Sequence, residues 1–444
     1  MPVVVPALRL ELPGPVDPAV AFRALAERYE HLVWADRPSG GPAFLGVALA
    51  EPVIVRAAEP GAFVTLLDRL RAGLPGPVAS PHLGWWGWFG YELGAAAQHV
   101  PVAATDAPAA AFLLAEVGVE FGAVTTVVAL PSRRVEGEAL VAELAPLIGA
   151  PPLPAAVPAA PTWRWRHERG RYLELIDRCL AAITAGDAYQ LCLTNRITAD
   201  LPAPLDPVDV LLRLRDGAPL AGAGIVRIAG WTLVSASPET ALVLDADGRA
   251  TSRPIKGTRP RDPDPERDRA LAEALRTDEK ERAENLMIVD LVRNDLARVA
   301  RTGSVAVPEL LVVESYQAVH QLVSTITAEI AGEPLDVVRS LLPAGSMTGA
   351  PKHAAMRILG ELEAGPRDVY AGAWGRLGAD GTLALAVVIR SVLLHGTTAT
   401  IGTGGGITIL SGPPSEWREL EVKAERMLRA IGVRDPFPST GPRR

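Results

Sequence analysis

Two pairs of glutamates, each spaced three residues apart, are the side chains best suited to chemistry in this sequence. Glu281 and Glu284 form one pair, and Glu416 and Glu419 form the other. Residues three apart lie on one face of a helix, so each pair would present two carboxylates together. Carboxylates without Cys or His beside them suit a hard ion such as Mg²⁺. Either pair alone could be a solvated helix face, but two pairs beside apolar positions favour a shared inward site.

Two glycine-rich stretches could bind an anion through backbone N–H groups. The run from Gly402 to Gly406 follows a strand-like segment, where bare N–H groups can form an anion-binding concavity. The stretch from Gly345 to Lys352 leads into a helix that Pro351 can start, and the first N–H groups of a helix are free. Neither stretch has the spacing of a Walker loop or of a dinucleotide fingerprint.

Several charged side chains interrupt apolar or turn-rich surroundings. Arg390 and Lys423 could hold carboxylates, although either could be an ordinary salt-bridge partner. Lys256 lies at a predicted strand end, where a confined lysine is costly unless it is paired or neutral. Glu239 follows a Ser-Pro pair, and His320 breaks an apolar run. A lone histidine in such a run is more often a core residue than a catalyst.

The elements that must position these residues are both helices and strands. Apolar residues at helical spacing predict a helix through 172–183 that ends at Gly186. Alternation predicts a strand in which Gln190, Cys192 and Thr194 share one face, and Asp247-Gly248 marks a hairpin. Further predicted elements are helices over 265–300 and 415–431 and strands over 382–394 and 397–401. Because strands and helices come in blocks with hairpins, an α+β fold with antiparallel sheets is expected.

The domain organisation is indicated by one Pro/Ala-rich stretch. Residues 145–162 cannot hold a helix or a central strand, so they are interpreted as a linker. They separate an N-terminal region, 1–144, from a catalytic region, 163–435, which a tail at 436–444 follows. Within the N-terminal region, the aromatic and glycine residues from Gly84 to Glu92 predict a closely packed corner of the core.

Composition excludes several functional classes. The 444 residues are 48% hydrophobic and 21% charged, with a net charge of -7 and no long basic run, so nucleic acid is not an expected partner. The only two cysteines, Cys179 and Cys192, offer neither a disulfide framework nor a Cys-based zinc site, and both are expected in the core. The first residues lack a signal-peptide pattern, and no stretch reaches ~20 apolar residues, so a cytoplasmic protein without membrane contact is expected.

Together these motifs resemble those of the chorismate-utilising enzymes, which include component I of anthranilate synthase and of aminodeoxychorismate synthase, and isochorismate and salicylate synthases. The resemblance implies two large antiparallel β-sheets packed together and flanked by helices, with an N-terminal region like that of anthranilate synthase component I. The matching stretches follow the family's order from about Trp163 to Gly432, and they are 186–193, 237–239, 254–259, 281–295, 318–325, 345–352, 390, 402–407 and 416–423.

The resemblance also implies roles for particular residues. Mg²⁺ would join Glu284 and Glu419 to the ring carboxylate of chorismate, with Glu281 and Glu416 binding it directly or through water. Glu239 would be the general acid for the departing C4 hydroxyl, and His320 would assist it. The implied substrate-binding residues are Gln190, Gly257, Thr258, Thr348, Tyr370, Arg390, Gly404, Gly405 and Lys423.

Two positions distinguish among the family's reactions. Members that add water have a lysine where this sequence has Gln190, so ammonia is the expected nucleophile here. Lys256 stands in Pro-Ile-Lys-Gly-Thr, which is similar to aminodeoxychorismate synthases, whereas anthranilate synthases usually have a small residue there. The implied reaction has neutral Lys256 attack C2 as the C4 hydroxyl leaves. Ammonia then enters at C4 and gives 4-amino-4-deoxychorismate, the p-aminobenzoate precursor of the folate branch.

The hypothesis also includes a source of ammonia, and two alternative functions are considered beside it. Neither cysteine has the context of a glutaminase nucleophile, so a separate glutamine amidotransferase subunit is expected to supply ammonia. The nearest alternative is anthranilate synthase component I, which aminates C2 and releases pyruvate. A non-catalytic chorismate-binding module is a different class of hypothesis, against which the presence of Glu239, Lys256 and His320 argues.

Overall fold

The computed structural model describes residues 4–36, 41–59, 61–153, 155, 158, 160–215, 222–317, 319–333 and 335–437. The helices within these ranges are α1 (Pro18–Arg28), α2 (Ala62–Gly73), α3 (Tyr91–Ala97), α4 (Arg134–Leu144), α5 (Arg169–Ala185), α6 (Pro207–Arg215), α7 (Pro265–Thr277), α8 (Glu279–Ala297), α9 (Asp336–Leu341), α10 (Lys352–Glu363) and α11 (Pro413–Ala430). None of these helices has the length and apolar character that a membrane span requires.

The strands are short to medium in length, and all their pairings are antiparallel except that of β1 with β6. They are β1 (Val5–Pro6), β2 (Leu8–Glu11), β3 (Leu32–Ala35), β4 (Ala43–Ala48), β5 (Val53–Val55), β6 (Val78–Ala79), β7 (Gly84–Phe89), β8 (Ala110–Phe121), β9 (Thr125–Ala129), β10 (Thr162–Trp165), β11 (Gln190–Asp200), β12 (Gly222–Ile228), β13 (Trp231–Ser237), β14 (Thr240–Leu244), β15 (Arg249–Arg253), β16 (Ile255–Pro260), β17 (Ala306–Ser315), β18 (Val319–Glu329), β19 (Gly349–Ala350), β20 (Ala373–Gly378), β21 (Leu383–Val387), β22 (Ser391–His395) and β23 (Thr398–Ile407).

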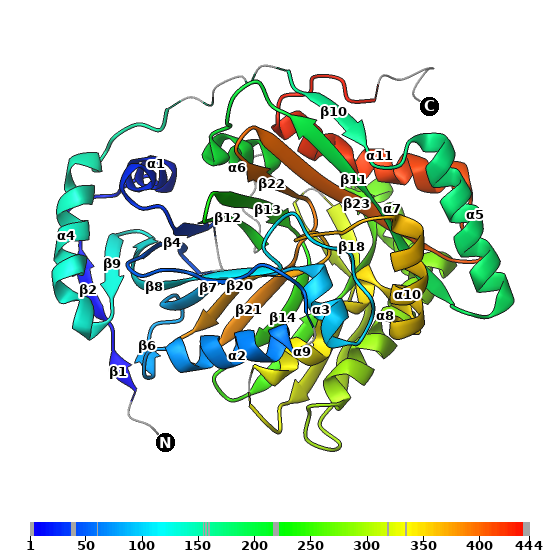
Figure 1. Ribbon diagram of the computed structural model, residues 1–444, viewed down its shortest axis with the longest axis horizontal. Coiled ribbons are helices and arrows are strands. Elements are labelled where there is room, and N and C mark those ends of the chain that lie inside the picture. The colour runs from blue at the N-terminus through cyan, green and yellow to red at the C-terminus, as the bar shows by residue number, and fades with distance from the viewer. Residues whose placement is uncertain are drawn as a thin grey trace.

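The pairings trace two large sheets that one long strand connects (Figure 1). The first runs β10–β11–β23–β22–β13–β12–β3–β4, and the second runs β7–β20–β21–β14–β15–β18 with β16 and β17 beside β18. The first half of β8 pairs with β7 and its second half with β4, so β8 belongs to both sheets. The predicted α+β architecture with two large antiparallel sheets is confirmed.

Three apolar clusters hold these layers together. One lies between the first sheet and α1, α4, α5, α6, α10 and α11. A second lies between the other sheet and α2, α3, α8 and α9. The third fills the space between the sheets and contains Phe44, Trp86, Trp88 and Trp374. Helices therefore flank a double sheet, and the aromatic stretch from Gly84 is part of its buried interior, as predicted.

The N-terminal region and the catalytic region share both sheets. β3 pairs with β12 and β7 pairs with β20, so strands from before and after the predicted linker are hydrogen-bonded to each other. The described part of 145–162 contains a short turn at Ala145–Leu147 and no further regular element until β10 begins at Thr162. The domain limits remain predictions, and most of the predicted tail, 438–444, lies outside the described residues.

Several predicted elements are confirmed because local signals decide them. α5 ends at Gly186, which has φ 85°, and the β14–β15 hairpin has Gly248 at φ 80°. Both conformations favour glycine because it lacks a Cβ. Cys179 and Cys192 are buried, as predicted, and burial raises the pKa of both thiols.

Three boundaries differ from the prediction. The helix expected over 265–300 is two helices, because the Asp278 carboxylate caps α8 by accepting from the Glu281 backbone N–H at 3.1 Å. The strand expected over 382–394 is broken at Arg390, whose φ of 51° ends β21 before β22. The glycine run from Gly402 does not follow a strand but lies inside β23, paired with β11.

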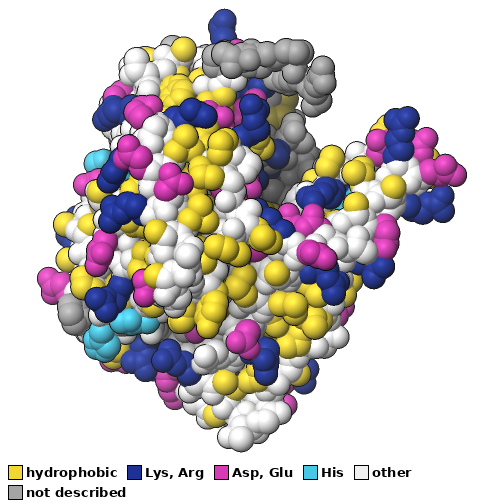
Figure 2. Space-filling view, turned by 90° about the vertical axis from the view of Figure 1, so that its right-hand side faces the viewer, with side chains coloured by type: hydrophobic (Ala, Val, Ile, Leu, Met, Phe, Trp, Pro, Cys, Tyr) yellow, Lys and Arg dark blue, Asp and Glu magenta, His cyan; other side chains and the backbone are white. Residues whose placement is uncertain are grey.

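The side of the molecule at the right of Figure 1 is where helices from both outer layers come together. Figure 2 shows that this side is hollowed between the main body and a projecting arm. Charged side chains of both signs border the hollow, with Asp and Glu close to Lys and Arg. Such mixed charge at a concave surface is typical of a binding site for a polar ligand.

Candidate active site

Carboxylates from α8 and α11 lie close to two successive glycines of β23. A Cβ at Gly405 would lie 3.3 Å from Glu416 Oε2 and 3.8 Å from Glu419 Oε1. A Cβ at Gly406 would lie 3.4 Å from Glu284 Oε2. Successive strand residues point to opposite faces, so the two glycines leave both faces of β23 without side chains here, and three of the four predicted glutamates lie around this glycine floor.

Lysine ammonium groups lie among these carboxylates. Lys280 Nζ is 3.9 Å from Glu284 Oε1 and 3.3 Å from Glu416 Oε1, so one cation joins the two helices. Lys423 Nζ is 2.6 Å from Glu419 Oε1. Burial opposes ionisation of Glu419, but Lys423 outweighs it and lowers the pKa of this carboxyl. Lys280 was not predicted as a site residue, although its spacing of four from Glu284 was a usable signal.

The arrangement fits a hard cation. The donors are carboxylate oxygens from two helices, and the Lys280 ammonium shows that a positive charge is stabilised between Glu284 and Glu416. In the described part of the chain, no three Asp, Glu, His or Cys side chains approach closely enough to form a metal site by themselves. Mg²⁺ commonly keeps several water or substrate oxygens, so a site with few protein ligands suits it.

Glu281 contacts Arg259 and Gly257. Its Oε1 is 3.8 Å from Arg259 Nη1, and its side chain packs where a Cβ at Gly257 would be, 3.0 Å from Cδ. Burial, and then the Glu284 carboxylate, raises the pKa of Glu281. Gly257 itself has φ 76°, so it is a position that favours glycine both by conformation and by space.

Lys256 points into the same site from β16. Its Nζ lies 3.7 Å from Glu284 Oε2, and the side chain is 16% exposed. Burial favours the neutral amine, but Glu284 and the more distant Glu239 and Glu419 favour the ammonium, and the pKa of Lys256 is raised. The neutral amine expected from the sequence is therefore not the form that these carboxylates favour while they are free of a bound cation.

Glu239 has the environment of a general acid. It is buried between β13 and β14, and its Oε1 accepts a hydrogen bond from Ser346 Oγ at 2.8 Å. Burial raises the pKa of Glu239, because the carboxylate would lose its hydration there. The protonated form that donates to a leaving group is thereby favoured. Ser346 was not predicted individually, although it lies in the glycine-rich stretch from Gly345.

Gln190 offers an unused polar group to the site. It is buried on β11, and its Nε2 lies 2.4 Å from where a Cβ at Gly406 would be. Its Oε1 is also buried and has no hydrogen-bond partner among the described residues. Because buried amide oxygens are normally paired, this one is suited to a ligand.

Arg390 contacts α11, and Tyr370 packs on the glycine run of β23. Arg390 Nη1 donates to the Lys423 carbonyl at 3.4 Å, and no carboxylate in the described ranges forms an ion pair with it. Burial lowers the pKa of this guanidinium, so pairing with a substrate carboxylate would be favourable. The Tyr370 ring packs on Gly402, where a Cβ would be 2.0 Å from Cγ, and burial raises the pKa of its phenol. Lys423 also donates to the carbonyl of Gly404 at 2.9 Å.

Two further predicted residues form hydrogen bonds with their neighbours, and a third is exposed. His320 Nε2 lies 2.9 Å from Asp268 Oδ1, and its Nδ1 lies 2.8 Å from Ser315 Oγ. Thr348 donates its hydroxyl proton to the carbonyl of Gly345 at 3.1 Å. Thr258 is exposed on β16. Their predicted roles stay predictions, and the geometry shows structural contacts for the first two.

Residues 33–429 match the protein-family model described as chorismate binding enzyme. The chain belongs to this family. Aminodeoxychorismate synthase of Streptomyces griseus is 39% identical over 467 residues, which cover 96% of this chain and 64% of that protein. This chorismate binding enzyme therefore spans less than two thirds of the length of that relative.

Two further relatives are similar over most of their length. Anthranilate synthase component 1 of Streptomyces coelicolor is 35% identical over 458 residues, covering 96% of this chorismate binding enzyme and 89% of the relative. The crystal structure of anthranilate synthase component I from Streptococcus pneumoniae TIGR4 superimposes with a TM-score of 0.72 at 25% identity, covering 97% and 93% of the two chains. The resemblance stated from the motifs is thus confirmed at the level of family and fold.

Proposed function

We propose that this chorismate binding enzyme aminates chorismate at C4 and forms 4-amino-4-deoxychorismate. The observation that carries the proposal is the placement of Lys256, whose Nζ lies 3.7 Å from Glu284 Oε2 inside the glutamate site. A lysine in Pro-Ile-Lys-Gly-Thr is typical of aminodeoxychorismate synthases, and the relative from Streptomyces griseus carries that name. Gln190, in place of the lysine of water-adding members, supports ammonia as the nucleophile.

Substrate carboxylates would be held by cations that face the glycine floor. Arg390 is free of acidic partners in the described ranges and can form two parallel hydrogen bonds with one carboxylate. Lys423 adds positive charge beside Gly404. Glu284 and Glu419 would hold Mg²⁺, with Glu281 and Glu416 binding it directly or through water, and the bound ion would draw electron density from the conjugated ring. The Lys280 ammonium would have to move from its place between the helices when the ion binds.

The proton and bond changes then involve three groups. Glu239, whose carboxyl pKa is raised by burial, would donate its proton as the C4–O bond breaks, and the hydroxyl would leave as water. The neutral amine of Lys256 adds at C2 in the same step, with a shift of the ring double bonds. Ammonia then adds at C4 while the bond between C2 and the lysine breaks. The product keeps its enolpyruvyl side chain and both carboxylates.

The proposed source of ammonia is a separate glutamine amidotransferase. This chorismate binding enzyme has two cysteines, and both are buried with a raised thiol pKa, which opposes a nucleophilic role. Free ammonium would replace the partner in a test with purified protein. The product is the precursor of p-aminobenzoate, which connects the proposal to the folate branch.

The reaction is tested by incubating the purified chain with chorismate, Mg²⁺ and ammonium chloride. We expect a product that yields p-aminobenzoate only after an aminodeoxychorismate lyase is added. Fluorescent anthranilate without the lyase would contradict C4 amination and establish the second candidate, anthranilate synthase. The similarity to the Streptomyces coelicolor enzyme over 89% of its length is the observation that favours this second candidate.

A further inference from the structure

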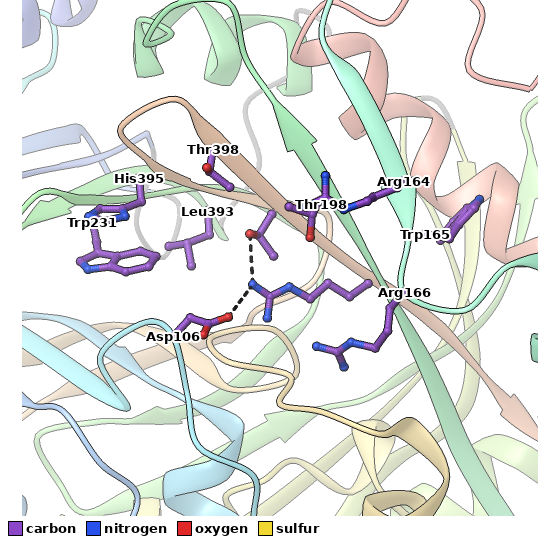
Figure 3. Close-up of a pocket in the computed structure, with 11 residues that line it drawn as sticks. Asp106, Arg164, Trp165, Arg166, Thr198, Trp231, Leu393, His395 and Thr398 are labelled. Carbon is purple, nitrogen blue, oxygen red and sulfur yellow. Dashed lines mark hydrogen bonds and ion pairs between the residues drawn. The ribbon is translucent and has the colours of Figure 1, made fainter.

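A cavity of about 500 Å³ lies away from the glutamate site, where β10, β11, β22 and β23 meet the segment around Asp106. Its volume is within the range of about 300–1,000 Å³ that is usual for small-molecule sites. None of its residues belongs to the proposed catalytic set. The lining residues that carry the argument are Arg166, Arg196, Thr398, Trp231, Leu393 and His395 (Figure 3).

One end of the cavity is cationic. Arg166 Nη2 donates to the Pro366 carbonyl at 2.6 Å, and no carboxylate in the described ranges forms an ion pair with this guanidinium. Burial, and then the neighbouring Arg196, lowers the pKa of Arg166, so an anion that binds beside it would be stabilised. Arg166 thus keeps several of its five N–H donors for a ligand.

Arg196 also keeps a donor unused. Its Nη1 lies 2.6 Å from Asp368 Oδ2, and its Nη2 lies 3.3 Å from Asp106 Oδ2 and 3.4 Å from Thr400 Oγ1. Its Nε is buried and has no hydrogen-bond partner among the described residues. Three arginines line the cavity, but Arg164 pairs with Asp200 at 2.7 Å and Arg196 with Asp368, so among the described residues Arg166 is the lining arginine without an ion pair.

The opposite end of the cavity is aromatic and apolar. The rings of Trp231 and His395, cross-strand partners on β13 and β22, are stacked with centroids 4.0 Å apart and an interplanar angle of 6°. Figure 3 shows Leu393 beside this pair, with Thr398 above it, while Arg164 and Arg166 lie at the other end. An indole fixed in this way presents a flat surface to another planar ring.

We propose that this cavity binds a small aromatic carboxylate, with the ring at Trp231 and Leu393 and the carboxylate at Arg166 and Arg196. A guanidinium matches a planar carboxylate by two parallel hydrogen bonds, and Arg166, which forms no ion pair in the described ranges, favours an anion. A purely inorganic anion would leave the aromatic end without a partner. A ligand with an aromatic ring and a carboxylate fits both the aromatic end and the cationic end of the cavity.

This cavity is separate from the glutamate site, although the two share strands. Arg196 and Thr198 lie on β11 and Thr400 on β23, whereas Gln190 lies at the beginning of β11. The two glycines of the floor are opposite Cys192 and Leu193, so three residue steps of β11, or about 10 Å, separate the floor from Arg196. A molecule in the arginine cavity therefore need not displace one at the glycine floor.

Calorimetric titration of the full chain with benzoate and with 4-aminobenzoate tests the proposal. We expect saturable 1:1 binding that is at least tenfold weaker in Arg166→Gln and in Trp231→Leu, each checked for an unchanged melting temperature. Binding should be unchanged in Arg171→Gln, a matched control that removes an exposed arginine paired with Glu174 on α5. Trp231→Leu keeps the test valid if Arg166→Gln does not fold.

A variant in the proposed active site distinguishes binding in this cavity from binding at the glycine floor. In Arg390→Gln, which weakens carboxylate binding at the glycine floor, the aromatic carboxylates should bind as they do in wild type. Binding that is lost in Arg390→Gln but kept in Arg166→Gln would overturn the proposal. Equal binding of inorganic phosphate, unaffected by Trp231→Leu, would also overturn it, as would the absence of any binding heat. These readouts do not depend on turnover, so they are independent of the proposed reaction.

Discussion

Adding one methyl group to the glycine floor should damage substrate binding without unfolding the protein. In Gly405→Ala, the new Cβ would lie 3.3 Å from Glu416 Oε2, 3.8 Å from Glu419 Oε1 and 3.9 Å from Lys423 Nζ. All three are ends of side chains that can move by a few tenths of an ångström. Gly405 does not have a positive φ, so the alanine backbone is unstrained. The free energy of unfolding should therefore change by less than about 1 kcal/mol.

The effect on catalysis should be much larger. The methyl group would occupy the space between the carboxylates and the lysine, where the substrate is proposed to lie. A displacement of ~1 Å at a reacting centre can cost ~100-fold in rate. We expect kcat/KM for chorismate to fall about 10- to 100-fold, which corresponds to about 1.4–2.7 kcal/mol of transition-state stabilisation.

The assay is steady-state kinetics with ammonium as the nucleophile, together with urea unfolding of each variant. Gly170→Ala is the matched control, because a Cβ at this exposed position on α5 would have no neighbour within 4 Å. Its kcat/KM should equal that of wild type. A Gly405→Ala enzyme with wild-type stability and kcat/KM within twofold of wild type would refute the location of the substrate.

The remaining predictions concern the metal, the lysine and the core. Glu419→Gln should raise the Mg²⁺ concentration for half-maximal turnover at least tenfold, and an unchanged magnesium dependence would show that α11 does not supply a ligand. Lys256→Ala should abolish or redirect C4 amination while Mg²⁺ binding, measured by calorimetry, is kept; wild-type amounts of the 4-amino product would exclude its covalent role. Burial raises the pKa of Glu92 to about 8, so the folded state holds a proton that the unfolded state releases as pH rises above its ordinary value of 4.5. Stability should therefore fall by ~2 kcal/mol between pH 5 and pH 7 through this group. Between pH 5 and pH 7, the free energy of unfolding of Glu92→Gln in urea should fall by ~2 kcal/mol less than that of wild type. An equal fall in both proteins would contradict the assignment.

The sequence predicts those parts of the site that depend on spacing within one element. Glutamates three apart on α8 and α11 had to share a face, and the structure brings Glu284, Glu416 and Glu419 to one floor. Gly186 as a helix end and Gly248 in a hairpin follow from their backbone conformations. These signals are local, so no knowledge of the tertiary fold was needed.

The contacts that the sequence did not predict are between distant segments. His320 pairs with Asp268, 52 residues away, and no local pattern indicates this contact. Ser346 reaches Glu239 across 107 residues, and no pattern in either segment indicates that contact. The break at Arg390 requires a positive φ in a non-glycine residue, which apolar alternation cannot show. Each depends on how the sheets bring segments together.

The most direct test of the proposed function is mass spectrometry of the product made by the purified chain from chorismate and ¹⁵N-labelled ammonium in the presence of Mg²⁺. We expect a product in which one hydroxyl of chorismate is replaced by a labelled amino group, with the enolpyruvyl side chain retained and no pyruvate released. Labelled anthranilate together with an equal amount of pyruvate would contradict it.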